Sequence, residues 1–259
     1  MKRLAAGVAG FLTSRIPGPS GTEWQRTNFA GDPVSLAGGV RAAIGAGVAA
    51  LVTGGRVGAA GVAAVTAGAV AGYVDDHREE EFESGKGLTG HLKQLSQGNV
   101  TTGVLKIGLI GAGAGVAALL LCDRRSVTDW VVRSVAIAGT ANLINLLDLR
   151  PGRALKVAGA GALLAMPRSG PTAPLLAGLA TTVAGNAGED LAGRTMLGDL
   201  GANALGAGLG VAMAGHPNRA VRTVVAGATV GLILASEKVS FSRVIDNNSV
   251  LSAIDRWGR

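Results

Sequence analysis

The chain has 259 residues, of which 48% are hydrophobic and only 16% are charged, and its mean hydropathy is +0.38. This charged fraction lies well below the roughly 25% of an ordinary soluble domain, and aromatic residues, at 3%, are too few for a soluble core of this size. Glycine is abundant, with 42 residues, but it follows no three-residue period, which excludes collagen. The composition therefore predicts an integral membrane protein whose helices approach closely through glycine and alanine.

The net charge is +7, and the basic residues are spread between the apolar stretches instead of gathering on one face. We therefore expect positively charged loops at a membrane surface and no nucleic-acid partner. The single cysteine, Cys122, excludes a disulfide framework within the chain.

Nine apolar stretches predict membrane-spanning helices, since a span needs about 20 mostly apolar residues. The first follows Lys2 and Arg3, a pattern that is also typical of the start of a signal peptide. The predicted fold is an all-α polytopic helical bundle forming a single domain over residues 1–259, with a tail at 236–259. The nine stretches lie at roughly 4–13, 40–55, 57–74, 101–122, 127–147, 154–166, 172–187, 200–215 and 219–235.

Threading these helices through a bilayer assigns the loops to two sides. The side that holds 75–99 and the tail carries most of the loop lysines and arginines, so we expect it to be cytoplasmic in a bacterial-type plasma membrane. Four aspartates fall on that same face, each at a helix end, where an acid is costly unless it is paired or bound to a cation. Ordinary solvated loop charge is the alternative for any one of them, but four together predict a site: Asp75, Asp76, Asp148 and Asp199.

Two acids close one predicted span, and a polar stripe runs along another. Asp75 and Asp76 project about 100° apart on a helix, so one can bind a metal while the other points at a substrate. Asn142, Asn145 and Asp148 recur every three residues and so lie within about 120° of each other. The stripe favours either a hydrogen-bonded helix contact or the recognition of a base and a ribose.

A third polar group is the run from Met196 to Asn203. Asp199 and Asn203 are four residues apart and share a helix face. Glycines beside the acid permit close approach of the backbone. Asp199 is also a favourable helix N-cap, and that interpretation is compatible with a catalytic one.

Glycine pairs in the apolar stretches favour close helix packing. Gly113, Gly115 and Ala118 have the spacing of a dinucleotide fingerprint, but that motif needs a strand, a turn and a helix, and these residues lie inside a predicted span. Small residues four apart permit a homodimer and serve equally well inside one bundle. The pairs are Gly68 and Gly72, Gly111 and Gly115, and Gly206 and Gly210.

The order of these motifs resembles the polyprenyl-phosphate hexosamine-1-phosphate transferase superfamily, which includes the phospho-N-acetylmuramoyl-pentapeptide translocases and the GlcNAc-1-phosphate transferases. The resemblance covers roughly residues 20–240. It is carried by Arg26-Thr-Asn-Phe-Ala-Gly-Asp-Pro33, Asp75-Asp76 with Lys86-Gly-Leu, Asn142-x-x-Asn145-x-x-Asp148 and Met196-x-Gly-Asp199-x-Gly.

The resemblance implies a Mg²⁺-dependent enzyme that moves a sugar-1-phosphate from a UDP-sugar to a polyprenyl phosphate in cell-envelope glycan synthesis, and releases UMP. It implies that Asp199 is a magnesium ligand, with Asp76 as a second, and that Asp75 or Asp76 deprotonates or positions the lipid phosphate. Lys86 is expected to neutralise phosphate. The remaining expected substrate contacts are Asn28, Asn142, Asn145, Asp148 and Asn203.

The chain also departs from the family. After Asp148 the family has a Gly-Leu-Asp-Gly-like run, whereas this chain has Leu149-Arg150-Pro151-Gly152-Arg153. Two other functions stay open at this point. One is a catalytically degenerate relative that binds lipid phosphate or a partner, and the other is a small transporter, for which intramembrane acids would suit an ion path.

Overall fold

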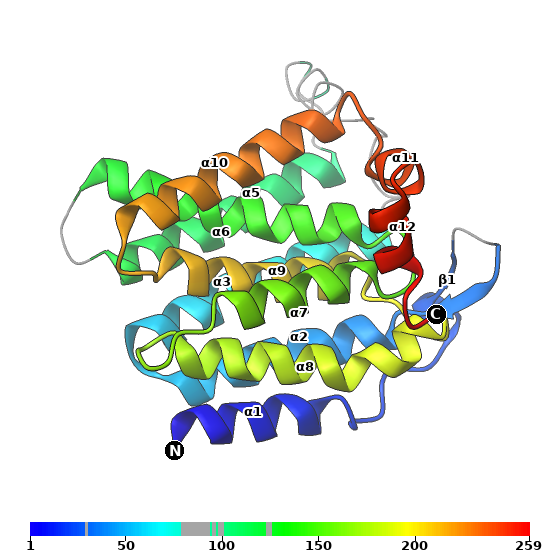
Figure 1. The fold of residues 1–259 in the computed structure, drawn as a ribbon, viewed down its shortest axis with the longest axis horizontal. Helices are drawn as coiled ribbons and strands as arrows, with labels where there is room; N and C mark the ends of the chain where they lie inside the picture. The colour runs from blue at the N-terminus through cyan, green and yellow to red at the C-terminus, as the bar shows by residue number, and fades with distance from the viewer. Residues whose placement is uncertain (29–30, 79–93, 95–96, 98–100, 123–125) are drawn as a thin grey trace.

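The computed structural model describes residues 1–28, 31–78, 94, 97, 101–122 and 126–259. Within these residues the chain is almost entirely helical (Figure 1). The long helices are α1 (Lys2–Thr13), α2 (Ala37–Thr53), α3 (Gly55–Arg78), α5 (Thr102–Leu121), α6 (Val127–Leu147), α7 (Arg153–Leu164), α8 (Ala173–Leu191), α9 (Gly198–Ala214) and α10 (Arg219–Ser236). A 3-10 turn (Thr22–Trp24), strands β1 (Gln25–Thr27) and β2 (Pro33–Ser35), and two short helices, α11 (Phe241–Asp246) and α12 (Ser249–Arg256), complete them.

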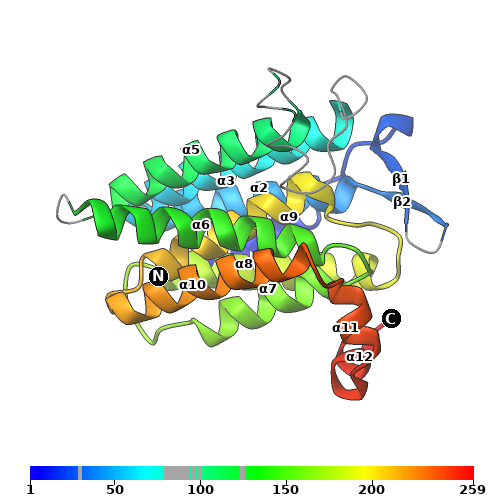
Figure 2. The same ribbon diagram turned by 90° about the horizontal axis from the view of Figure 1, so that it is seen from above.

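The long helices run side by side along the longest axis and give the bundle two distinct ends (Figures 1 and 2). The N-terminus lies at one end, whereas the β-hairpin, α11 and α12 lie at the other (Figure 1). Several starts are fixed by side-chain caps: the hydroxyl of Thr101 accepts from the Val104 amide at 3.2 Å, and that of Ser126 from the Asp129 amide at 3.3 Å. Such caps satisfy the unpaired amides of a first helical turn.

The prediction of an all-helical bundle is confirmed, because each of the nine apolar stretches is helical. The prediction of nine spans is not confirmed. Four helices are long and apolar enough to cross a membrane, namely α3, α5, α6 and α10. The helices α1 and α7 have 12 residues each, which is about 18 Å of helix against a hydrocarbon core of about 30 Å. A stretch rich in glycine and alanine is apolar whatever its length, so its composition alone does not show that it is long enough to span the membrane.

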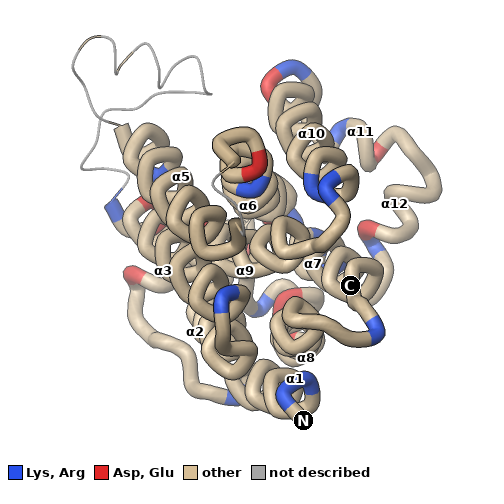
Figure 3. Tube along the Cα trace, turned by 90° about the vertical axis from the view of Figure 1, so that its left-hand side faces the viewer, with Lys and Arg blue, Asp and Glu red and all other residues tan. Residues whose placement is uncertain are grey.

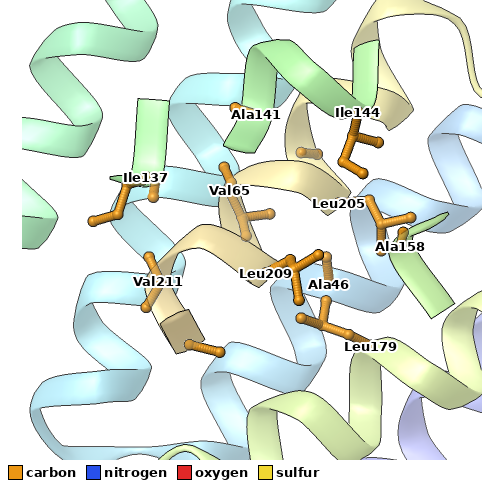
Figure 4. Packing of buried hydrophobic residues seen from close by; sticks show 14 of the residues in the cluster. Ala46, Val65, Ile137, Ala141, Ile144, Ala158, Leu179, Leu205, Leu209 and Val211 are labelled. Carbon is orange, nitrogen blue, oxygen red and sulfur yellow. The ribbon is translucent and has the colours of Figure 1, made fainter. Parts of the chain in front are cut away.

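Helix α9 lies at the centre of the bundle and packs against α2, α3 and α6. Its glycines make these approaches possible: a Cβ on Gly201 would lie 2.9 Å from the Gly39 carbonyl oxygen, and one on Gly206 2.8 Å from that of Thr140. The surrounding core is built mainly of alanine, with larger side chains such as Ile137 and Leu205 filling the remaining space (Figure 4). Close packing through small residues is the expected source of association where lipid gives no hydrophobic drive.

The glycine pairs divide between these contacts and the surface. Gly68 and Gly206 face backbone of neighbouring helices, so they are used inside the bundle. Gly111, in contrast, has open space where a Cβ would be.

The first loop is tied to the start of α9. Strands β1 and β2 pair antiparallel, with Gln25 opposite Ser35. Ser35 in turn accepts a backbone hydrogen bond from Met196 at 2.9 Å and donates one to Arg194 at 3.1 Å. The hairpin therefore holds the turn that leads into Asp199.

Candidate active site

Charged groups from three helices meet at the hairpin end of the bundle. Asp75 lies near the end of α3, Lys106 near the start of α5, and Asp199 in the first turn of α9. The Lys106 ammonium donates to Asp75 Oδ2 at 2.9 Å and forms an ion pair with Asp199. The three side chains are 12%, 23% and 29% exposed, so one buried cation bridges two largely buried carboxylates. We call these three residues the acidic triad, because they carry a net charge of −1 when all are ionised.

Asn145 completes this cluster from α6. With its amide turned to satisfy both neighbours, its oxygen accepts from Lys106 Nζ at 3.0 Å and its nitrogen donates to Asp199 Oδ1 at 3.0 Å. The sequence predicted Asp75, Asp199 and Asn145 as site residues, and the structure brings them together. Lys106 was not predicted. The available signal was a lone charge inside a long apolar helix, which is expected to have a buried partner.

Asp76 has a different role from its neighbour. Its two carboxylate oxygens accept hydrogen bonds from the backbone amides of Asp199, at 3.2 Å, and Leu200, at 2.9 Å. The residue before α9, Leu197, supplies no side-chain cap of its own. Asp76 therefore caps α9 from another helix, and its negative charge also suits the positive end of the helix dipole. Of the two predicted magnesium ligands, Asp199 alone faces the cation in the cluster.

Asp148 is buried just beyond the end of α6. Its burial, together with the nearby Asp190 carboxylate, raises the pKa of Asp148 well above its usual range. Asp190 accepts a hydrogen bond from the Gly152 amide at 2.6 Å and so holds the turn between α6 and α7. A raised pKa favours the neutral carboxyl group, which can donate a hydrogen bond where an ionised one cannot.

The other predicted substrate contacts lie at varied distances from the cluster. Asn203 is fully buried and donates to the Asp199 carbonyl oxygen at 2.7 Å, so it rigidifies the first turn of α9. Asn142 lies on α6, three residues before Asn145, and is half-buried. Asn28 is in the hairpin, where its side chain accepts from the Asp32 amide at 2.9 Å and shapes the turn. Lys86 lies outside the described residues.

The run that departs from the family pattern holds the C-terminal tail. Arg150 donates to both carboxylate oxygens of Asp246, at 3.1 and 2.9 Å. Arg153 does the same to Asp255, at 2.7 and 3.1 Å, and its side chain is only 4% exposed. These two-pronged contacts give the arginines a structural role. In this chain the run therefore docks α11 and α12 onto the bundle.

An aromatic cluster borders Asp76 on the side of the hairpin. Tyr73 and His77 stack with ring centroids 4.4 Å apart, and Trp24 meets His77 edge-on at 4.5 Å. Arg26, next to this cluster in the chain, lies near enough to Asp76 for their charges to attract. The sequence analysis did not identify the cluster, because Trp24 lies 49 residues from Tyr73 and no local pattern joins them.

The donor set fits a magnesium ion chemically. Among the described residues, no three histidine, cysteine or acidic side chains are arranged to hold a metal ion. Carboxylate and amide oxygens, the ligands that Mg²⁺ prefers, nevertheless converge on the Lys106 ammonium from Asp75, Asp199 and Asn145. Further oxygens on Asp148 and Asn203 are buried without a hydrogen-bond donor in the described part of the chain. The two carboxylates are thus stabilised by a positive charge between them, and Lys106 supplies it in this structure.

No protein-family model matches the chain, and no curated protein matches it significantly. The fold and the site define a class: a helical bundle in which, among the described residues, four helices are long and apolar enough to span a membrane, with a buried cluster of charges at one end.

Proposed function

We propose that this chain transfers a sugar-1-phosphate from a UDP-sugar to a polyprenyl phosphate, at the end of the bundle that holds the acidic triad. The single observation that carries the proposal is the Lys106 ammonium between Asp75 and Asp199, with Asn145 beside it. The resemblance of the ordered motifs supports it. So does the location, because the end of a spanning helix lies near the membrane surface, where a soluble donor and a lipid acceptor meet.

The residues present have the chemistry that this reaction requires. Mg²⁺ held by Asp199 and the neighbouring oxygens would polarise the diphosphate and offset the charge of the attacking phosphate. Asp75 would orient the lipid phosphate or take its proton. Lys106 has three ammonium donors, which can turn from the carboxylates to phosphate oxygens. Asp76 and Asn203 would keep the first turn of α9 in place.

Four helices that are apolar and long enough to span support a membrane protein. A bacterial-type plasma membrane with the acidic triad on its cytoplasmic side belongs to the proposal, together with the polyprenyl phosphate and UDP-sugar partners.

A degenerate relative that binds lipid phosphate without chemistry is the second candidate. The observation that favours it is that Lys106 satisfies both carboxylates internally. A binding protein would use the same ammonium to hold phosphate and would have no need of the metal.

The test is UMP release by the purified chain in detergent, with Mg²⁺, undecaprenyl phosphate and a panel of UDP-sugars. We expect release that requires both lipid and metal and that disappears in Asp199→Asn. Asp246→Asn is the matched control, because it makes the same chemical change at an exposed acid of the tail. Folded protein that releases no UMP with any donor, yet binds the lipid phosphate, would replace the transferase by the binding protein.

A further inference from the structure

A hollow lies at the end of the bundle opposite to the acidic triad, where the chain begins. It has a volume of about 1700 Å³ and is formed by the ends of the helices together with the loop between α7 and α8. Its described walls carry seven basic side chains and one carboxylate. The basic residues are Lys2, Arg3, Arg56, Arg133, Arg168, Arg219 and Arg222, and the carboxylate is Asp129. We call it the basic hollow.

The one carboxylate is already neutralised. Asp129 accepts from Arg133 Nε at 2.7 Å and from an Arg222 terminal nitrogen, also at 2.7 Å. Both arginine side chains are 8% exposed, and they also donate to backbone carbonyls, among them those of Ala214 and His216. One acid between two buried arginines leaves a net charge of +1 fixed in the wall.

Four of the remaining cations face outward without acidic partners among the residues that the structure describes. Arg3, Arg168 and Arg219 make no ion pair with any residue that the structure describes, and Lys2 has only the Thr53 carbonyl, at 3.3 Å. Helices α1, α3, α6, α8 and α10 begin at this end, whereas α2, α5, α7 and α9 end there, so the helix dipoles largely cancel and the basic side chains set the field. Figure 3 looks onto this end and shows the basic residues at the starts of α1 and α10.

We infer that the basic hollow binds an anion that carries phosphate groups, such as a lipid headgroup or a free diphosphate. Arginine forks match phosphate oxygens in pairs, and helix N-termini bind phosphate through their amides. Apolar side chains also line the hollow, including Leu164, Met166 and Met213, which suits a headgroup that arrives with a hydrocarbon chain.

The test compares two double variants with the same change in charge. Arg168→Gln with Arg219→Gln removes two unpaired cations of the hollow, whereas Arg15→Gln with Arg194→Gln removes two exposed cations outside the hollow and the tail. Each purified protein is titrated with pyrophosphate in detergent. It is also assayed by native mass spectrometry for retained lipid after reconstitution with phosphatidylglycerol or phosphatidylcholine.

We expect the hollow variant to bind at least roughly tenfold more weakly than wild type, because a charge-assisted hydrogen bond contributes on that order, and the control variant to be unchanged. Binding of pyrophosphate alone identifies a soluble anion, and selective retention of phosphatidylglycerol identifies a lipid headgroup. If the hollow variant matches wild type in both arms, or the two variants lose equally, the inference is wrong. UMP release does not enter this test, so the proposed transferase stands or falls separately.

The tail carries an independent observation, because α12 turns its polar face to the protein and its apolar face outward. Ser252 and Asp255 are 7% and 6% exposed, whereas Val250 is 66% exposed, Ile254 54% and Trp257 77%. In a helix packed on a protein in water the apolar stripe faces the core. Here the carboxylate of Asp255 docks the helix onto Arg153 and Arg259.

We also infer that this stripe lies in the headgroup region of the bilayer at the end of the acidic triad. Helix α10, which leads to the tail, exposes Val224 and Leu234 at 68% and 55%, as a lipid-facing span does. Trp257 and the basic residues Arg243 and Arg256 have the composition of an interfacial helix, since tryptophan and arginine favour that layer.

Spin labels on single cysteines test this placement. In a Cys122→Ser background, a label at Ile254→Cys is compared with one at Asn247→Cys, which is exposed but off the stripe. In lipid nanodiscs we expect the first label to favour collisions with oxygen and the second to favour a water-soluble nickel chelate. Equal exposure of both labels to the chelate would mean that the stripe is not in lipid.

Discussion

The two ends of the bundle hold mirrored charge arrangements. At one end the Lys106 cation lies between Asp75 and Asp199, and at the other the Asp129 anion lies between Arg133 and Arg222. The acidic triad brings together residues of three helices, α3, α5 and α9, and the second triad residues of two, α6 and α10. Both triads are largely buried. The first leaves a net charge of −1 and the second +1. A buried cluster with a residual charge attracts a ligand of opposite charge, so one end is suited to a cation and the other to an anion.

The difference also lies in what surrounds each triad. The acidic triad has a further buried acid, Asp148, and a dedicated cap, Asp76, close by. The basic triad, formed by Asp129, Arg133 and Arg222, opens onto a hollow in which Arg3, Arg168 and Arg219 make no ion pair with any residue that the structure describes. The two ends therefore differ in how fully their charged groups are paired. At the acidic end several hydrogen bonds hold the groups in place, whereas at the basic end some arginines have no acidic partner and can bind an anion.

The largest expected effect comes from removing the central charge of each triad. Lys106→Met leaves Asp75 and Asp199 facing each other, and Asp129→Asn leaves Arg133 and Arg222 without their shared carboxylate. Breaking one side of a buried ion pair costs about 3–5 kcal/mol, so both variants should lose this much free energy of unfolding in mixed-micelle titrations.

A double variant controls for general damage to the packing. Lys106→Met with Asp75→Asn should recover part of the lost stability, because the second change removes the uncompensated acid. If Lys106→Met alone is as stable as wild type, the triad is not an energetic unit and the comparison between the ends fails.

A cation should distinguish the two broken triads. Without its ammonium, the acidic triad has a net charge of −2, so millimolar Mg²⁺ should raise the thermal midpoint of Lys106→Met more than that of wild type. Asp129→Asn serves as the matched control, since the uncompensated charges that it leaves, on Arg133 and Arg222, are positive and do not bind Mg²⁺. An equal response of both variants would remove the reason for expecting a cation at the acidic end.

A smaller effect is expected from the cap that only the acidic end possesses. Asp76→Asn keeps the shape of the side chain but weakens acceptance from the Asp199 and Leu200 amides, at 3.2 and 2.9 Å in the wild type. Loss of a cap costs about 1 kcal/mol, and we expect a decrease of that size with retained helicity. A fall as large as that of Lys106→Met would instead indicate that Asp76 belongs to the charge cluster itself.

Much of the fold follows from the sequence, but the number of spans does not. Apolar stretches predicted every long helix, since hydropathy reports burial and lipid contact alike. It does not separate a helix that crosses the bilayer from a shorter one, such as α1 or α7, that packs within the bundle. Which glycine-rich helices pack against each other depends on both partners, so the sequence of one helix does not predict its neighbour.

The candidate site was predictable where its residues share a helix end. Asp75, Asp199 and Asn145 could be found because acids and amides at the ends of apolar helices need partners. Lys106 could be recognised as a lone charge inside an apolar helix that needs a buried partner, but its distance in sequence from Asp75 and Asp199 does not show which acids those partners are. The roles of Arg150 and Arg153 depend on acids 96 and 102 residues further along the chain, so no local pattern could show that they hold the tail.

The smallest expected effect is the pH response of that tail. Burial alone would raise the pKa of Asp255, but the hydrogen bond from Arg153 and the charges of Arg153 and Arg259 lower it overall. A depressed folded pKa means that the ion pair contributes stability above the pKa of the unfolded chain, about 4 for an aspartate, and loses it as the pH falls through the lower, folded value. Acidification below about pH 4 should therefore release α12 before the bundle unfolds, detectable as a change in Trp257 fluorescence in a Trp24→Phe, Trp130→Phe background.

Asp255→Asn should show the released signal at every pH, because its tail lacks the ionised partner from the start. A tail signal that titrates identically in Asp255→Asn would assign the change to another acid and separate the tail from its arginine dock.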